Sequence, residues 1–280
     1  FHGMASVVHN VSGDSAFEDG QAMTGATDGL VSVIGSAGYV TEATFVNASE
    51  SAAQLQLVAY PAAGGSTPAA AKVVVVLPHG QVSFPDVVKK LGLAAGFTGS
   101  LAWTASQPVV GVTRELVKVG KRYSGFAPIQ RARDAAARVV VPYVEDTAGF
   151  ATALELTNPG AFAANTTVRL FETADASGAT PGIEAARDLT VAVNSALPIA
   201  DVVRWARRDA ATTPSGKRGF VVVSTPQAVL GHARLVDLAT QDPALIDGGA
   251  VTEAFSSVVV RVEPLPFATP AGAEPATGAS

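Results

Sequence analysis

The chain has no cysteine and few charged residues, and both shortages limit what it can be. Without cysteine there are no disulfides, thiolate metal sites or thiol nucleophiles. Charged residues make up 15% of the 280 residues, whereas about 25% is usual for a soluble domain. Hydrophobic residues reach 48%, so the polar surface must consist mostly of Ser, Thr, Gly and Ala. This texture is common among secreted and cell-surface proteins.

Long apolar runs are also missing. The longest, such as Val73–Leu77 and Val139–Val141, fall far short of the ~20 residues that cross a bilayer, so we predict no membrane span. The first residues show neither a basic region nor an apolar core of the kind found in signal peptides. We therefore expect a mature or trimmed product rather than a precursor.

Basic residues are absent from residues 1–71, which contain six acidic ones. Residues 114–138 show the opposite bias, with seven basic and two acidic residues. The net charge of −5 and the lack of a basic recognition helix argue against a nucleic-acid partner. Ordinary solvated faces would explain the bias. The more specific interpretation is an acidic end that meets a basic surface on a neighbouring molecule.

Catalytic motifs are missing too, including G-x-S-x-G, H-E-x-x-H, G-x-x-x-x-G-K-[ST] and G-x-G-x-x-G. Gly13-Asp14-Ser15 has the letters of a lipase-like nucleophile block, but no apolar strand precedes it, which favours a turn. Asp14, Glu18 and Asp19 match no calcium-loop spacing. The histidines are scattered along the chain: His2, His9, His79 and His232. We therefore predict a protein that is not an enzyme and that holds neither a metal nor another cofactor.

What the chain does contain is one stretch used twice. Thr104–Leu116 returns as Ser224–Leu235, with Gln107 matching Gln227 at a distance of 120 residues. Each copy alternates apolar and polar side chains around a Pro-containing centre, which predicts two strands joined by a turn. A period above one hundred residues suits tandem β-domains rather than a solenoid. Arg114 and Arg234 should therefore sit at the same place on the two domains, each paired with a carboxylate or a carbonyl.

Two further stretches repeat at similar distances. Gly38–Asn47 and Gly149–Asn158 lie 111 residues apart, alternate apolar with polar residues and end in asparagine, which starts turns. Phe84–Leu91 and Pro198–Trp205 carry Pro and Asp early and basic residues late, a pattern typical of a short helix. We expect the length differences between the copies to fall in loops.

The second copy, with Leu156-Thr157-Asn158-Pro159-Gly160, resembles the tandem Ig-like β-sandwich repeats of large secreted bacterial surface proteins. The first copy departs from that motif, because Ala48-Ser49 follows Asn47. The resemblance implies a mostly β protein of two tandem Ig-like β-sandwich domains, each with one short helix, plus extended terminal segments. It implies no catalytic residues. The expected units are an N-terminal strand and loop (1–27), repeat 1 (28–137), repeat 2 (138–256), and a C-terminal strand with a Pro/Ala/Gly-rich tail (257–280).

The ends of the chain are out of register with these repeats. Phe1–His9 is similar to the last strand of a repeat, and Val258–Val262 is similar to an opening strand. A lone strand leaves backbone groups unpaired, so we expect each to complete a sheet in the adjacent repeat or in another copy of the chain. The residues predicted to contact other subunits are Val7, Val8, Val258, Val259, Val260 and Phe267.

These features predict a non-catalytic structural subunit of an extracellular filament or cell-surface assembly, polymerising head-to-tail with other copies of itself. The alternative is a carbohydrate-binding or adhesive module of a larger secreted protein. In that case polysaccharide would be the partner and the aromatic residues would form the platform, namely Tyr39, Trp103, Phe150 and Trp205. Three sequons mark possible glycosylation sites at Asn10, Asn47 and Asn165.

Overall fold

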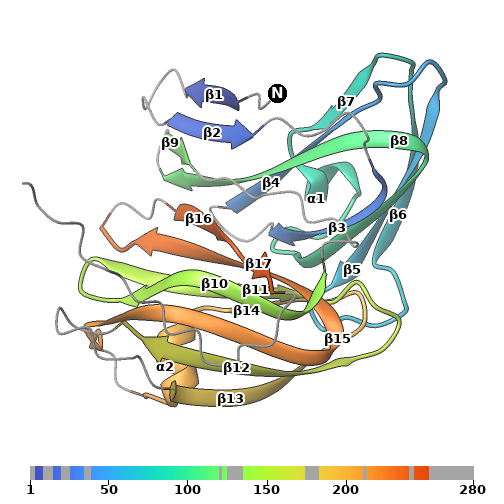
Figure 1. Cartoon of the computed structure of the whole chain (residues 1–280). Coiled ribbons are helices and arrows are strands. Elements are labelled where there is room, and N and C mark those ends of the chain that lie inside the picture. Colours follow the sequence, from blue (N-terminus) through green and yellow to red (C-terminus); the bar gives the residue numbers. More distant parts are fainter. Residues whose placement is uncertain are drawn as a thin grey trace, which may run out of the picture.

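The computed structural model shows a mostly β protein whose strands form two large antiparallel sheets (Figure 1). The structure describes residues 4–8, 15–19, 26–34, 39–119, 122–124, 135–173, 183–210, 213–239 and 243–251. Within these residues the two helices are short, and each lies in the stretch of chain that forms one of the large sheets. We call the unit from β3 to β9 repeat 1 and the unit from β10 to β17 repeat 2.

Repeat 1 contains seven strands and one helix. They are β3 (Ala26–Ile34), β4 (Tyr39–Val46), β5 (Ala53–Pro61), β6 (Ala70–Val76), β7 (Gln81–Phe84), α1 (Val87–Lys90), β8 (Thr98–Val119) and β9 (Arg122–Ser124). The strand order is β6-β5-β8-β4-β7, with β3 and β9 also paired to β8. All of these pairings are antiparallel.

Repeat 2 has corresponding elements in the same order and one further strand, β17. They are β10 (Ala136–Asp146), β11 (Phe150–Thr157), β12 (Ala164–Glu172), β13 (Ile183–Val191), β14 (Ala196–Ile199), α2 (Val202–Arg207), β15 (Lys217–Asp237), β16 (Pro243–Asp247) and β17 (Gly249–Ala250). The pairings β13-β12-β15-β11-β14 and β10–β15 match β6-β5-β8-β4-β7 and β3–β8 of repeat 1, while β10 also pairs with β11 and β17. The predicted duplication is thus visible strand by strand, and Val221–Ser224 lies in a strand as expected.

The repeated stretch is one long strand in each copy and not the predicted pair of strands with a turn. The first half of β8 pairs with β3 and β5, while its second half pairs with β4. Pro108 lies between the last β5 partner, Ala105, and the first β4 partner, Val110. Proline has no N–H, and at this change of partners the sheet requires none. The strand therefore continues through the residues that had indicated a turn.

Because β8 and β15 each pass from one group of strands to another, each sheet folds over on itself in a sandwich or barrel-like arrangement. The space inside holds one hydrophobic cluster per repeat. In repeat 1 the cluster centres on Phe45, Leu55 and Trp103, whose rings and side chains are at most 2% exposed. In repeat 2 it centres on Leu154 and Val221, which are fully buried. Alternating side chains on each strand supply these clusters.

Both repeats use the same local devices. Asp86 caps α1 by accepting from the Lys89 N–H at 2.9 Å, and Asp201 caps α2 through the Arg204 N–H at 3.1 Å. These caps satisfy backbone donors that would otherwise be left open at the start of each helix. The predicted helices are therefore confirmed, with an aspartate serving the same function in each.

A buried asparagine follows the second strand of each repeat. Asn47 is fully buried, and its amide nitrogen donates to the carbonyls of Ser51, Val76 and Leu77 at 2.7–3.2 Å. Asn158 is equally buried and donates to the carbonyls of Phe162 and Val191. Each holds a hairpin loop against the end of a neighbouring strand.

Candidate functional site

The residues predicted to contact other subunits are only partly described. Val7 and Val8 lie in β1 (Met4–Val8), which pairs with β2 (Ser15–Asp19) as an antiparallel hairpin. The N-terminal strand is therefore not an orphan, and the expectation of a loop up to residue 27 was wrong. The sequence Ser15–Asp19 has few strongly apolar residues, which hid the strand. Val258, Val259, Val260 and Phe267 lie outside the described residues.

The three predicted glycosylation sites differ in their surroundings. Asn165 is exposed on β12 and accepts a hydrogen bond from Thr190 at 3.0 Å. Asn47 is fully buried by the contacts described above, so its amide is not accessible in the folded domain. That prediction is at odds with the structure, because the sequon pattern does not distinguish a structural asparagine from an exposed one. Asn10 lies outside the described residues.

Of the aromatic residues proposed as a sugar platform, the two tryptophans are not brought together, and the side chain of Tyr39 lies outside the described part of the structure. Trp103 lies in the core of repeat 1, where its ring meets Phe45 edge-on at 5.5 Å. Trp205 lies in repeat 2, packed against the core with the Arg187 guanidinium 4.6 Å from its ring. Phe150 is 36% exposed on β11. The two tryptophans are thus packing residues of separate repeats.

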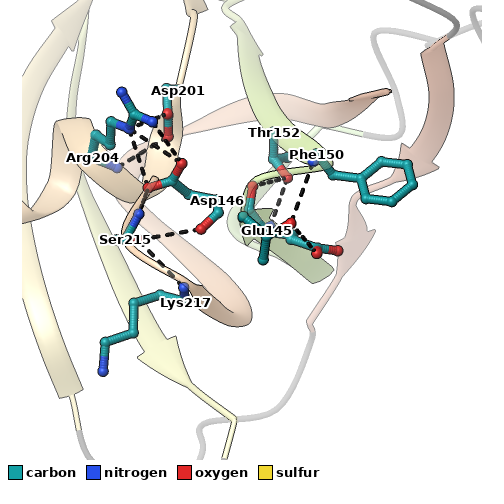
Figure 2. A network of polar contacts seen from close by, with 9 residues as sticks. Glu145, Asp146, Phe150, Thr152, Asp201, Arg204, Ser215 and Lys217 are labelled. Carbon is teal, nitrogen blue, oxygen red and sulfur yellow. Dashed lines mark hydrogen bonds and ion pairs between the residues drawn. The ribbon is translucent and has the colours of Figure 1, made fainter. Parts of the chain in front are cut away.

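The densest group of polar contacts lies at the end of β10, where Asp146 meets α2 and the segment before β15 (Figure 2). Asp146 is fully buried and accepts from Arg204 at 3.0–3.2 Å and from the Ser215 N–H at 2.8 Å. Arg204 also forms an ion pair with the helix cap Asp201 at 3.1 Å. The position in repeat 1 that corresponds to Arg204 is Lys89, on α1.

Electrostatics keep Asp146 ionised. Burial acts to raise its pKa, but hydrogen bonds from Arg204 and Ser215 outweigh burial and hold the pKa of Asp146 below its ordinary value. The pKa of Asp201 is raised, mainly by burial and also by the negative charge of Asp146. The pKa of Arg204 is raised by its hydrogen bond to Asp146.

The adjacent carboxylate, Glu145, points to the other side of β10 and has its own partners. It accepts from Tyr143 at 2.6 Å, from Thr147 at 2.6 Å and from Arg218 at 3.0 Å. Burial acts to raise the pKa of Glu145, but these hydrogen bonds outweigh it and lower the pKa. The hydrogen bond between Tyr143 and Glu145 also raises the pKa of Tyr143.

This arrangement joins segments and does not resemble a reaction centre. Each carboxylate is ionised and its oxygens are occupied by arginine, hydroxyl or backbone donors, whereas a general acid or base needs a pKa near the working pH and access to a substrate proton. Asp146 and Arg204 tie together β10, α2 and the approach to β15, and Glu145 fastens the turn between β10 and β11.

The contact between the two repeats was not foreseen from the sequence. The turn Ala192–Ser195, between β13 and β14, docks on the loop that follows β5. The Gly65 N–H donates to Val193 O at 2.8 Å, and the Ser195 hydroxyl donates to Ala62 O at 2.8 Å. The Ser100 hydroxyl donates to Asn194 O, and the Asn194 amide reaches Gly65 O at 3.4 Å.

This junction is packed closely. Ser100 and Ser195 are at most 1% exposed, although both are polar. A Cβ on Gly64 would lie 2.7 Å from Ala192 Cβ and 2.8 Å from Val193 O, so only glycine fits there, and its φ of +73° also suits glycine. The signal available in the sequence was Val193-Asn194-Ser195 after a strand, a turn pattern that does not reveal its partner.

A second surface distinguishes the repeats. The terminal strand β6 exposes Val73 by 61% and Val75 by 58%, and Leu77, the residue directly after the strand, is 67% exposed. The corresponding face of β13, the terminal strand of repeat 2, carries exposed Asp188 and Thr190 instead. Their hydrogen bonds to Thr167 and Asn165 on β12 give that face a polar network. Repeat 1 alone therefore presents an apolar edge.

Comparisons with protein-family models, with curated proteins and with solved structures each found no match to the chain. Across the described ranges no helix is long and apolar enough to cross a membrane. The same residues contain no group of three or more His, Asp and Glu side chains placed to hold a metal ion.

Proposed function

We propose that the chain is a non-catalytic structural subunit of an extracellular filament or cell-surface assembly, built from two Ig-like β-sandwich repeats. The observation that carries this proposal is the direct junction between the repeats. The turn Ala192–Ser195 is held by hydrogen bonds to Ala62, Gly65 and Ser100. Such a junction holds one repeat in a fixed orientation on the other, which a structural subunit requires. A flexible linker would leave the two repeats free to move independently.

The polar chemistry of the chain supports the same role. The buried carboxylates Glu145 and Asp146 are occupied by structural partners, and the buried asparagines Asn47 and Asn158 hold hairpin loops in place. These residues stabilise the frame of the repeats. The low content of charged residues and the exposed sequon at Asn165 favour an extracellular setting.

Association with other copies is the second part of the proposal. The exposed apolar edge of β6 is unusual for an isolated protein, because an unpaired strand edge with apolar side chains invites association. The strand predicted at Val258–Val262 would add a further contact. The hairpin between β1 and β2 shifts the expected contact away from the N-terminal strand, since that strand already has a partner.

Negative-stain microscopy and sedimentation velocity of the full chain over a range of concentrations test this function. We expect assemblies that lengthen with concentration, because a head-to-tail contact leaves two free ends. A parallel binding series with neutral and acidic polysaccharides covers the alternative function. Monomers at all concentrations, together with saturable polysaccharide binding, would contradict the structural proposal.

A further inference from the structure

The contact that joins the two repeats inside the chain is made of two parts, and each repeat contains both parts. Each repeat has one turn that points outward, between its fourth and fifth strands, and one receiving end, where its third strand meets the start of its long strand. Within the chain, the turn of repeat 2 docks on the receiving end of repeat 1. This leaves the turn of repeat 1 and the receiving end of repeat 2 without a partner inside the described part of the chain.

The outer turn of repeat 1, Leu77–Gly80, has the geometry of the docked one. It connects β6 to β7 as Ala192–Ser195 connects β13 to β14. His79 has a φ of 52° and Asn194 a φ of 53° at the same position in the turn. The docked turn is buried at Ser195, whereas Leu77, Pro78 and His79 are exposed.

The receiving end of repeat 2 has the backbone geometry of the receiving end of repeat 1. In repeat 1 Tyr60 lies opposite Ser100, and in repeat 2 Phe171 lies opposite Phe220. The next backbone bond is also shared, because the Ala62 N–H donates to Thr98 O and the Thr173 N–H donates to Arg218 O, both at 2.9 Å.

A pair of glycines confirms how closely the two ends correspond. A Cβ on Gly99 would lie 2.0 Å from Tyr60 O, and a Cβ on Gly219 would lie 2.0 Å from Phe171 O. The long strand therefore passes its neighbour at the same short distance in both repeats. Up to Ala62 in repeat 1 and Thr173 in repeat 2, the two receiving ends share this backbone arrangement and differ in their side chains.

The side chains differ in a matched way. The docked turn carries Ala192 where the outer turn carries Leu77, which is 67% exposed. The occupied receiving end carries Ser100 where the outer one carries Phe220, whose ring stacks on Phe171 at 4.8 Å and remains partly exposed. The contact between the two repeats thus uses small side chains, whereas the outer turn and the outer receiving end carry large apolar side chains at the same positions.

Charge is complementary at the same two places. Glu50, beside the outer turn, is 91% exposed and pairs with His79 at 3.0 Å. Arg218, beside Thr173 at the outer receiving end, is 58% exposed and pairs with Glu145 of its own repeat at 3.0 Å. The corresponding residues at the inner junction, Ala161 and Thr98, are neutral. Each of these charged groups has a partner in its own copy, so charge at the rim of the contact contributes to orientation, and the apolar side chains contribute the main attraction.

We propose that a second copy of the chain docks the turn Leu77–Gly80 of its repeat 1 on the Phe171–Phe220 end of repeat 2 of the first copy. This inference rests on the proposed structural function and specifies its contact. Leu77 would pack on the stacked Phe rings, and the valines of β6, Val73 and Val75, would extend the apolar contact. The two surfaces differ, so the contact is heterologous and continues from copy to copy.

Three variants of the full chain test the contact by sedimentation velocity. Leu77→Asp places a charge at the start of the turn, and Phe220→Ser introduces the residue type that the receiving end of repeat 1 has at the same position, Ser100. We expect each to raise the dissociation constant about thirtyfold or more, the effect of removing an apolar anchor. Phe162→Ser removes another exposed phenylalanine, 76% exposed and outside both surfaces, and should leave association unchanged.

Mixing the variants tests the head-to-tail geometry. A Leu77→Asp chain keeps an intact receiving end, and a Phe220→Ser chain keeps an intact turn. Each should be monomeric alone, whereas an equal mixture should form dimers that grow no further. A symmetric contact between like ends would give no such rescue. If circular dichroism shows that Phe220→Ser does not fold, Thr173→Glu replaces it, because it adds an acidic side chain at the exposed rim of the same end, where Glu50 of the next copy would approach.

The outcomes separate the two proposals. Assemblies that dissolve with Leu77→Asp and return as dimers in the mixture support both. Assemblies that form equally well with the variants overturn the docking inference and leave the structural function standing, with the contact elsewhere. Wild-type chains that remain monomeric at every concentration overturn both.

Discussion

Repeat 1 and repeat 2 share a frame and differ in what they attach to it. The frame includes the strand order, the capping aspartates Asp86 and Asp201, and the buried asparagines Asn47 and Asn158. Repeat 2 adds the buried pair of Asp146 with Arg204, while repeat 1 adds the apolar edge of β6. The comparison indicates that backbone-directed contacts define this fold, while side-chain chemistry at the ends and edges distinguishes the two copies.

The largest expected effect tests whether the frame is the same in both repeats. Gly99→Ala and Gly219→Ala each place a Cβ 2.0 Å from a backbone oxygen on the neighbouring strand. Because the backbone must shift to relieve this clash, we expect each substitution to lower the free energy of unfolding by about 3 kcal/mol. Urea unfolding measures this loss, and Gly149→Ala, with open space around its Cβ, is the control. A small loss at only one of the two glycines would break the equivalence.

The buried asparagines should give the next largest effect. Asn47→Ala and Asn158→Ala leave backbone carbonyls without their amide donors. Each should lower the free energy of unfolding by about 2 kcal/mol. The single tryptophan of each repeat allows the loss to be assigned, because Trp205→Phe leaves Trp103 to report on repeat 1 and Trp103→Phe leaves Trp205 to report on repeat 2. Asn165→Ala, on the surface, should change little; equal losses at all three sites would contradict the assignment.

How far the sequence alone determined this picture can be judged from particular residues. The asparagines and aspartates were found because they recur at matching positions, and repetition is visible without coordinates. Their contacts were not visible in the sequence, because the Asn47 side-chain amide donates to the carbonyl of Val76, 29 residues away. Pro108 indicated a turn because proline often begins one, yet it lies at a change of strand partners.

The candidate surfaces were harder to foresee for the same reason. Charge and hydrophobicity along the chain do not show that Ser195 meets Ala62 across 133 residues. The apolar run Val73–Leu77 was visible, but its alternation between core and outer face depends on the pairing of β6 with β5. The register in which a strand pairs decides which alternate side chains of an apolar strand are buried.

The buried ion pair between Asp146 and Arg204 should give a loss confined to repeat 2. Asp146→Asn removes the charge that Arg204 and Ser215 surround. A broken buried pair is costly, but Arg204 is 23% exposed and can regain water, so we expect a loss of about 2 kcal/mol. The Trp205 signal should move to lower urea and the Trp103 signal should not. Equal shifts of both signals would show that the repeats unfold as one unit.

Acid should reveal the same difference to a smaller extent. The pKa values of Glu145 and Asp146 are below their ordinary values in the folded protein. Their stabilisation is therefore complete above the unfolded pKa of about 4 and is lost as the pH falls through the folded values. The raised pKa of Asp201 acts in the opposite direction and offsets part of the loss. Repeat 2, followed by Trp205 fluorescence, should lose stability more steeply below about pH 4 than repeat 1, and Asp146→Asn should reduce the difference.

The central claim is that one junction, seen inside the chain, also joins chain to chain, and cryo-electron microscopy of assemblies formed by the full chain tests it most directly. The account predicts an unbranched series of repeats in which the step from repeat 2 of one copy to repeat 1 of the next resembles the step within a copy. Leu77 should lie at the contact with Phe171 and Phe220. Assemblies held together through another surface, with the turn Leu77–Gly80 in solvent, would contradict the account.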